Sequence, residues 1–383
     1  MPYPSVDALQ NMLAEEVFGH TKHSKKAAGR ALGTLVEVIT YYTLTSWGFR
    51  NAIAIERGLP EYANDIISHN VEYTLHPIVE HIDLVVQNPR LPLSSAKILK
   101  ALDGKISWAN RDNRKSSNQL LSSKGILRNS CTIADDGDLF ATAHLNEVRD
   151  DLADIDIYAL YHHPYMMVEC KRVGVEEGAK KGPQTIEKAK QGAYVARTVS
   201  SLQKLRLPDG RAGGVIVAED GSHSIGEFRD LLETVVESDG SDVLSRFTLS
   251  VGVVSNHGNW FTAELKNKEM EVLAGSYDWL LFLTDEGMME FLNDLILNPP
   301  EEYAAVKEAF GESHKKNKDQ TRFTKVQMDY DADLALQSYF AANVDKVEGW
   351  FNIIGPAGFE LDHLREQVTK LWNKDWNSIH KLA

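Results

Sequence analysis

The chain has 383 residues, of which 43% are hydrophobic and 25% are charged, and its formal net charge is -14. The length allows two or three structural units with a sizeable core, whereas the acidic balance excludes a protein that coats polyanions with its whole surface. No apolar run is long enough to span a bilayer, and two cysteines cannot build a disulfide framework or a four-cysteine metal site. We therefore expect a cytoplasmic protein without membrane contact.

The first predicted elements are helical. A short amphipathic helix is expected over residues 5–19, and a longer helix over 29–47, where apolar residues recur at helical spacing. Residues 70–75 alternate between polar and apolar side chains, which predicts a strand. The segment 94–128 is polar, basic and rich in Ser and Asn. It fits either an insertion that faces DNA or a plain surface subdomain.

The middle of the chain alternates between strands and helices. Strands are predicted from residue 154, over 213–218 and over 247–254, with helices from Pro183 to about residue 205 and over 225–237. This succession predicts an α/β fold with a central mixed β-sheet flanked by helices. The C-terminal region is predicted to be mostly helical.

The most informative segment begins at Asp154 and reads DIDIYALYHHPYMMVECK. Two β-runs flank a His-His-Pro turn; the first carries Asp154 and Asp156, and the second ends on Glu169-Cys170-Lys171. Side chains alternate along a strand, so Glu169 and Lys171 share one face and Cys170 points away. If the two runs pair as a hairpin, one Asp lies beside the Glu/Lys face. A divalent cation is a physical reason for such carboxylates to gather in a half-buried strand.

This Asp-x(n)-Glu-x-Lys pattern resembles the PD-(D/E)xK nuclease superfamily, which includes most type II restriction endonucleases, Holliday-junction resolvases and recombination-repair exonucleases. The helix with Glu37 looks like the first core helix of the family, and the apolar run before Glu169 looks like its hydrophobic strand. A later helix with Lys188 and Gln191 looks like the helix that packs against the site. The resemblance covers residues 25–260 and implies a restriction-endonuclease-like core.

The resemblance also implies a set of metal ligands. Mg²⁺, with Mn²⁺ as a substitute, would be held by Glu169, by Asp156 or Asp154, and by the main-chain carbonyl of Cys170. Asp156 is the first choice of the two aspartates because isoleucines flank it on both sides. Asp154 lies on the same strand face and competes with it. The alternative is that both are surface acids on an edge strand.

Other residues would act on the attacking water and the phosphate. The resemblance implies that Lys171 positions or deprotonates the water and stabilises the transition state. Glu37 would bind a second metal or a metal-bound water, and Gln191 would reach the phosphate or the water; each also fits a solvated helix face. His162 and His163 are expected to be turn residues rather than zinc ligands, because no third ligand follows at a supporting spacing.

These features predict a type II restriction endonuclease that cuts double-stranded DNA as a homodimer, because a palindromic target requires two related active sites. The nuclease core would span 1–285, with the insertion at 94–128, and the region 286–383 would serve DNA recognition or dimerisation. A cognate DNA methyltransferase is expected in the same system, without direct contact. The alternatives are a structure-specific repair or recombination nuclease and a non-catalytic nucleic-acid-binding protein on the same fold.

Overall fold

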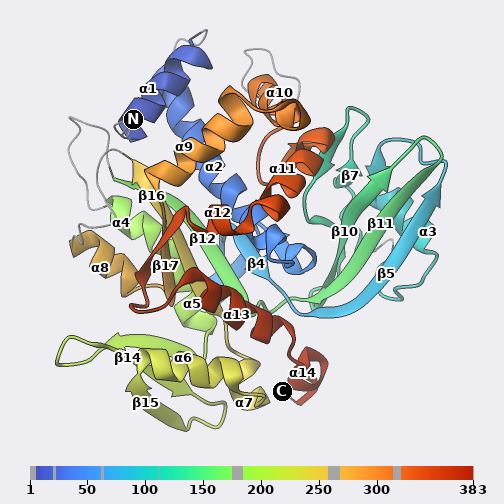
Figure 1. Ribbon diagram of the computed structural model, residues 1–383. Helices are drawn as coiled ribbons and strands as arrows, with labels where there is room; N and C mark the ends of the chain where they lie inside the picture. Colours follow the sequence, from blue (N-terminus) through green and yellow to red (C-terminus); the bar gives the residue numbers. More distant parts are fainter. Residues whose placement is uncertain are drawn as a thin grey trace.

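The computed structural model describes residues 6–19, 23–61, 64–110, 112–174, 184–257, 268–313 and 321–382. A six-stranded mixed sheet runs through the centre (Figure 1), and its strands in spatial order are β1 (Ile53–Ile55), β4 (Tyr73–Leu75), β12 (Met166–Gly174), β16 (Leu249–His257), β17 (Trp279–Leu283) and β19 (Phe351–Gly355). The three middle strands β12, β16 and β17 are parallel, and the flanking pairs are antiparallel. The predicted α/β fold with a mixed central sheet is confirmed.

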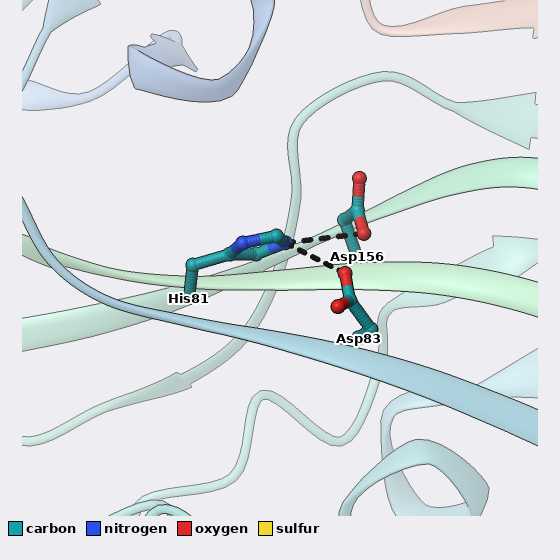
Figure 2. Close-up of side chains that lie close together, drawn as sticks. All are labelled: His81, Asp83 and Asp156. Carbon is teal, nitrogen blue, oxygen red and sulfur yellow. Dashed lines mark hydrogen bonds and ion pairs between the residues drawn. The ribbon is translucent and has the colours of Figure 1, made fainter.

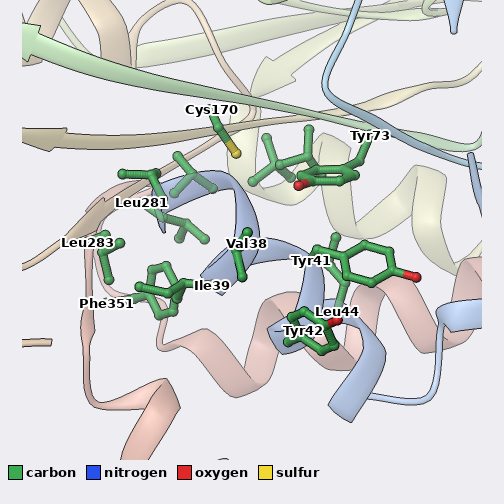
Figure 3. Packing of buried hydrophobic residues seen from close by; sticks show 14 of the residues in the cluster. Val38, Ile39, Tyr41, Tyr42, Leu44, Tyr73, Cys170, Leu281, Leu283 and Phe351 are labelled. Atoms are coloured by element: carbon green, nitrogen blue, oxygen red, sulfur yellow. The ribbon is translucent and has the colours of Figure 1, made fainter. Parts of the chain in front are cut away.

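One face of this sheet is covered by α2 (Ser24–Ser46), whose apolar side chains recur at helical spacing and bury against the middle strands. Figure 3 shows this contact, with Val38 and Ile39 of α2 facing Cys170 and Leu281 of the sheet. The short helix α1 (Val6–Glu16) packs against α2. The predicted helices at 5–19 and 29–47 thus correspond to α1 and α2.

The opposite face is covered by three helices: α4 (Gln184–Ala189), α5 (Gln191–Val199) and α8 (Lys268–Ala274). Val173, Val254 and Phe282 bury against them, whereas their neighbours Cys170, Val253 and Leu281 face α2. Because successive side chains on a strand point to opposite faces, the middle strands bury apolar residues on both sides, and β17 is apolar throughout.

A second sheet lies beside the first, on the right of Figure 1. Its strand order is β5 (Ile78–Gln87), β11 (Leu152–Tyr161), β10 (Leu139–Val148) and β9 (Cys131–Asp135). One face packs on α3 (Ser95–Leu102) in a separate apolar cluster. A four-stranded sheet adjoins it, with the order β18 (Gln327–Asp329), β8 (Ile126–Arg128), β7 (Gln119–Leu121) and β6 (Leu93–Ser94). The polar segment 94–128 therefore contributes short strands and a helix to this region.

Two smaller units precede the C-terminal region. β2 (Gly58–Glu61) and β3 (Asn64–Asn70) form a two-stranded sheet. β13 (Leu202–Arg206), β14 (Ala212–Val217) and β15 (His223–Glu227) form a separate sheet with α6 (Phe228–Glu237) and α7 (Ser241–Leu244), at the bottom of Figure 1. The prediction of a helix to about residue 205 is wrong, because the chain leaves α5 at Val199 and enters β13. The strand predicted over 213–218 exists as β14 but lies outside the central sheet.

The C-terminal region shares the central core. Its helices are α9 (Asp285–Leu292), a π-helix (Asn293–Leu297), a 3-10 turn (Glu301–Tyr303), α10 (Ala304–Ser313), α11 (Tyr330–Ala342), α12 (Val344–Glu348), α13 (Leu361–Trp372) and α14 (Trp376–Leu382). Another 3-10 turn, Arg50–Ala52, follows α2. β19 pairs with β17, β18 pairs with β8, and α11 packs against α2. Within the described ranges, none of the helices combines the length and the apolar character needed to cross a membrane.

The predicted hairpin between the runs at 154–161 and 166–171 is wrong. β11 already has two antiparallel partners, β10 and β5, whereas β12 lies between β4 and β16 in the other sheet. The segment that joins them, with its His-His-Pro sequence, therefore carries the chain from one sheet to the other. β12 is buried on both faces over Met166–Cys170, which suits a central strand with a parallel neighbour rather than one arm of a half-exposed hairpin.

Candidate active site

Glu169 and Lys171 lie on β12 with their side chains in contact. The distance between Lys171 Nζ and Glu169 Oε1 is 2.7 Å, and only 1% of the Glu169 side chain is exposed. His69 Nε2 on β3 lies 3.8 Å from the same oxygen. Cys170 faces the opposite way and packs under α2 (Figure 3), and burial raises the pKa of its thiol. Its main-chain carbonyl as a metal ligand stays a prediction.

Glu72 provides the second carboxylate beside Lys171. It immediately precedes β4. In the antiparallel β4–β12 register Tyr73 is opposite Val168, so the next position along places Glu72 opposite Glu169. The main-chain N–H of Glu72 donates to Glu169 Oε2 at 3.4 Å, and Lys171 Nζ lies 3.4 Å from Glu72 Oε1. Glu72 thus occupies the position beside Glu169 and Lys171 that the sequence assigned to an aspartate of β11. Glu72 is one of the polar residues in the alternating segment 70–75, and that position is the sequence signal that could have pointed to Glu72 as a site residue.

Glu37 reaches the same place from α2. Its neighbour in space is Lys325, which lies in the segment that leads into β18. Lys325 Nζ lies 3.5 Å from Glu37 Oε2 and 3.2 Å from Glu56 Oε1. It also forms an ion pair with Glu72 Oε2. Only 7% of the Lys325 side chain is exposed. Burial raises the pKa of Glu37, although the Lys325 ammonium opposes that rise. Sequence reasoning placed Glu37 near the site and missed both Lys325 and Glu56.

We call this group the carboxylate cluster, and it consists of Glu37, Glu56, Glu72, Glu169, Lys171 and Lys325. With all six side chains ionised, four carboxylates face two ammonium groups, which leaves two formal negative charges. Glu169 Oε1 is buried and accepts no hydrogen bond from the described part of the chain, and the Lys171 ammonium and the His69 ring are the groups beside it. An oxygen-only donor set with this excess of negative charge fits Mg²⁺ or Mn²⁺.

Helix α5 closes the cluster on the side opposite α2. Gly192 lies so close to β12 that a Cβ there would be 2.8 Å from Glu169 Cβ and 2.9 Å from Met167 Cε. A larger residue would therefore push α5 away from the strand. Gln191 is the first residue of α5 and is exposed beside Gly192, and Lys188 is exposed on α4. Their predicted contacts with a phosphate stay predictions.

The two aspartates of β11 lie elsewhere. Asp156 pairs with Asp83 of β5 and His144 of β10 in the second sheet, and it accepts a hydrogen bond from His81 (Figure 2). Asp154 lies two residues away on the same strand, opposite Val85. The expectation that one of them joins Glu169 is wrong, because β11 and β12 belong to different sheets. The alternation of side chains along β11 is as predicted, but β11 pairs with β5 and β10 instead of β12.

Comparisons with protein-family models, with curated proteins and with solved structures gave no match. The geometry of the carboxylate cluster and the sequence pattern around it therefore carry the functional argument.

Proposed function

We propose that the chain is a metal-dependent nuclease that hydrolyses phosphodiester bonds of double-stranded DNA. The observation that carries this proposal is the meeting of Glu72, just before β4, with Glu169 and Lys171 of the neighbouring strand β12, while Glu37 reaches in from α2. Carboxylates around one lysine are the composition expected of a phosphodiesterase that uses Mg²⁺. The resemblance to PD-(D/E)xK nucleases supports the same chemistry, with Glu72 in place of the expected aspartate.

The carboxylates of Glu72 and Glu169 are the best candidates to hold the ion, because they are the least exposed of the four and both contact Lys171. When bound, Mg²⁺ would neutralise charge on the phosphate and lower the pKa of a bound water. Lys325 contributes by holding Glu72, Glu56 and Glu37 together through its ammonium group. That contact keeps like-charged carboxylates in place before substrate arrives.

Two residues are suited to the chemical step. Lys171 has a partly exposed ammonium, and at that position it stabilises negative charge that develops on the phosphate. Glu37 has a raised pKa, so it accepts a proton from the attacking water more readily than an ordinary glutamate. The water oxygen then bonds to phosphorus, the P–O bond to the leaving sugar oxygen breaks, and that oxygen takes a proton from solvent.

Site-specific cleavage by a homodimer is the form of this activity that the resemblance favours most. Under this proposal the substrate is a short duplex sequence, and segments outside the carboxylate cluster read its bases. A structure-specific repair or recombination nuclease would use the same cluster on junctions or nicked DNA. The two kinds of nuclease differ in the DNA that they cleave and not in their catalytic residues.

The test is cleavage of several supercoiled plasmids and of a four-way junction in Mg²⁺ and in EDTA. The variants Glu72→Gln and Lys171→Ala should each lower the rate at least about a hundredfold, and circular dichroism should show that they remain folded. Glu308→Gln and Lys307→Ala, which change exposed residues of α10, are the matched controls and should cleave normally.

Discrete fragments that need Mg²⁺ and Glu72 would support a site-specific endonuclease. Preferential cleavage of the junction would move the assignment to a repair nuclease. If folded wild-type protein cleaves none of these DNAs with Mg²⁺ or Mn²⁺, the proposal is refuted.

A further inference from the structure

A second group of metal-ligating side chains lies on the exposed face of the second sheet, away from the carboxylate cluster. His81 Nε2 lies 3.1 Å from Asp156 Oδ1 and 3.2 Å from Asp83 Oδ1 (Figure 2). One ligand atom from each of the three residues lies within 4.8 Å of the other two. We call these three residues the His-Asp-Asp cluster. Neither the sequence pattern nor the proposed nuclease mechanism uses it as a unit.

The cross-strand register makes this arrangement costly without a cation. Asp156 is directly opposite Asp83, and like charges in that position destabilise an antiparallel pair. The neighbour of Asp156 on its other side is His144, which is buried. Asp156 accepts a hydrogen bond from His81, which also lies 3.2 Å from Asp83 Oδ1. A divalent cation bound among these three residues would offset the repulsion between the two carboxylates.

Contacts behind the ligand atoms hold two of the three residues in place. The His81 ring stacks on Tyr158, with 4.4 Å between the ring centroids and an interplanar angle of 5°. Tyr158 is fixed in turn by Asn51 Nδ2, which donates to its hydroxyl at 2.7 Å, and that hydroxyl lies 3.4 Å from Asp156 Oδ2. Supporting contacts of this kind orient ligands at protein metal sites. The ring is thus held with Nε2 directed at both carboxylates.

We propose that the His-Asp-Asp cluster binds a divalent transition-metal ion such as Zn²⁺. Zinc bonds to nitrogen and carboxylate oxygen are about 2.0–2.2 Å long, so two ligand atoms on the same ion lie roughly 3.0–3.5 Å apart. The distances from His81 Nε2 to the two carboxylate oxygens, 3.1 Å and 3.2 Å, fall in this interval. An imidazole nitrogen favours zinc-like ions over Mg²⁺, which distinguishes this site from the carboxylate cluster.

Three protein ligands leave the remaining coordination positions to water. Asp83 is 80% exposed and His81 is 42% exposed, so solvent and small ligands reach the ion directly. Sites with this number of ligands and an open position are the ones that activate water, whereas structural zinc sites are closed by four protein ligands. The inference stands on the second sheet alone and does not depend on the nuclease proposal.

The experiment is a calorimetric titration of metal-free protein with Zn²⁺, accompanied by NMR of the histidine ring signals. Asp83→Asn and His81→Ala should each weaken one Zn²⁺ site at least about tenfold, and Zn²⁺ should shift the His81 ring signals in the wild type. Glu80→Gln, an exposed acid on the same strand, is the matched control and should bind as the wild type does. Glu169→Gln removes a ligand from the carboxylate cluster and should leave this site intact.

Two results would overturn the proposal. One is Zn²⁺ binding whose affinity is unchanged in both Asp83→Asn and His81→Ala, which would place the ion elsewhere. The other is a wild-type protein whose His81 signals do not respond to Zn²⁺, which would show that His81 does not bind the ion. Loss of DNA cleavage in Glu169→Gln with Zn²⁺ binding retained would show that the two sites are independent.

Discussion

Replacing Lys325 by Met tests whether a cation is needed among the carboxylates of the cluster. Met keeps most of the length and the apolar stem of the lysine but removes the ammonium group. That group contacts Glu37, Glu56 and Glu72 and is almost completely buried. After the replacement, these carboxylates face one another without their shared counter-charge.

The cost is set by the carboxylate that is least able to reach water. Removing one partner of a buried ion pair costs about 3–5 kcal/mol. This figure applies to Glu72, whose side chain is 12% exposed, whereas Glu56 is 53% exposed and adds less than about 1 kcal/mol. Glu72 also keeps Lys171 at 3.4 Å. We therefore expect Lys325→Met to lower the free energy of unfolding by about 3 kcal/mol in metal-free buffer.

Mg²⁺ should restore much of this loss if it binds the same carboxylates. A ligand present at a hundredfold excess over its dissociation constant stabilises the folded state by about 2.7 kcal/mol. The variant should gain more from Mg²⁺ than the wild type does, because no ammonium group competes with the ion. The assay is urea unfolding followed by tryptophan fluorescence, in EDTA and in Mg²⁺, with Lys307→Met as an exposed control. Equal stability of variant and wild type in EDTA, or an equal gain from Mg²⁺, would refute the reasoning.

Three further results are expected. Asp156→Asn should cleave plasmid DNA at the wild-type rate, whereas Glu72→Gln should slow cleavage; if Asp156→Asn is the slower variant, the aspartate of β11 belongs to the nuclease site after all. Gly192→Ala should cost about 1–3 kcal/mol in urea unfolding and slow cleavage, because its Cβ collides with Glu169; unchanged stability would mean that α5 adjusts freely. Because burial lowers the pKa of His144 to about 3, the folded state binds fewer protons than the unfolded state between that value and the ordinary 6.5. Stability should therefore fall as the pH is lowered through this window, and His144→Gln should flatten the fall measured by urea unfolding.

The sequence was sufficient for features that depend on local periodicity. The helical spacing of apolar residues predicted α2, and alternation along β12 correctly separated Glu169 from Cys170. Both patterns arise because one face of each element is buried against the core. The mixed central sheet followed from the succession of apolar strands and helices. These predictions needed no information about which strands pair.

The pairing of strands could not be predicted from the local sequence pattern. Both runs of the predicted hairpin are real strands, β11 and β12, and the turn between them contains proline, so the sequence was consistent with a hairpin. What decides against it is the competition of β5 and β10 for both edges of β11. β10 directly precedes β11, but β5 lies far from it in the chain, so that pairing leaves no local signal. Lys325 is a similar case, since its role depends on a contact with α2 and the start of β4 that no spacing in the sequence records.

The position of the carboxylate cluster follows from where β4 ends. Along β12, only Met166–Val168 pair with β4, whereas β16 pairs with β12 as far as Gly174. Glu169 and Lys171 thus lie on the part of β12 that has lost its antiparallel partner, and Glu72 precedes the first residue of that partner. A strand in the middle of a sheet tolerates charged residues poorly, because their hydration is lost on both faces. The end of β4 is the point at which β12 can carry a buried glutamate and a lysine and still present them to a phosphate.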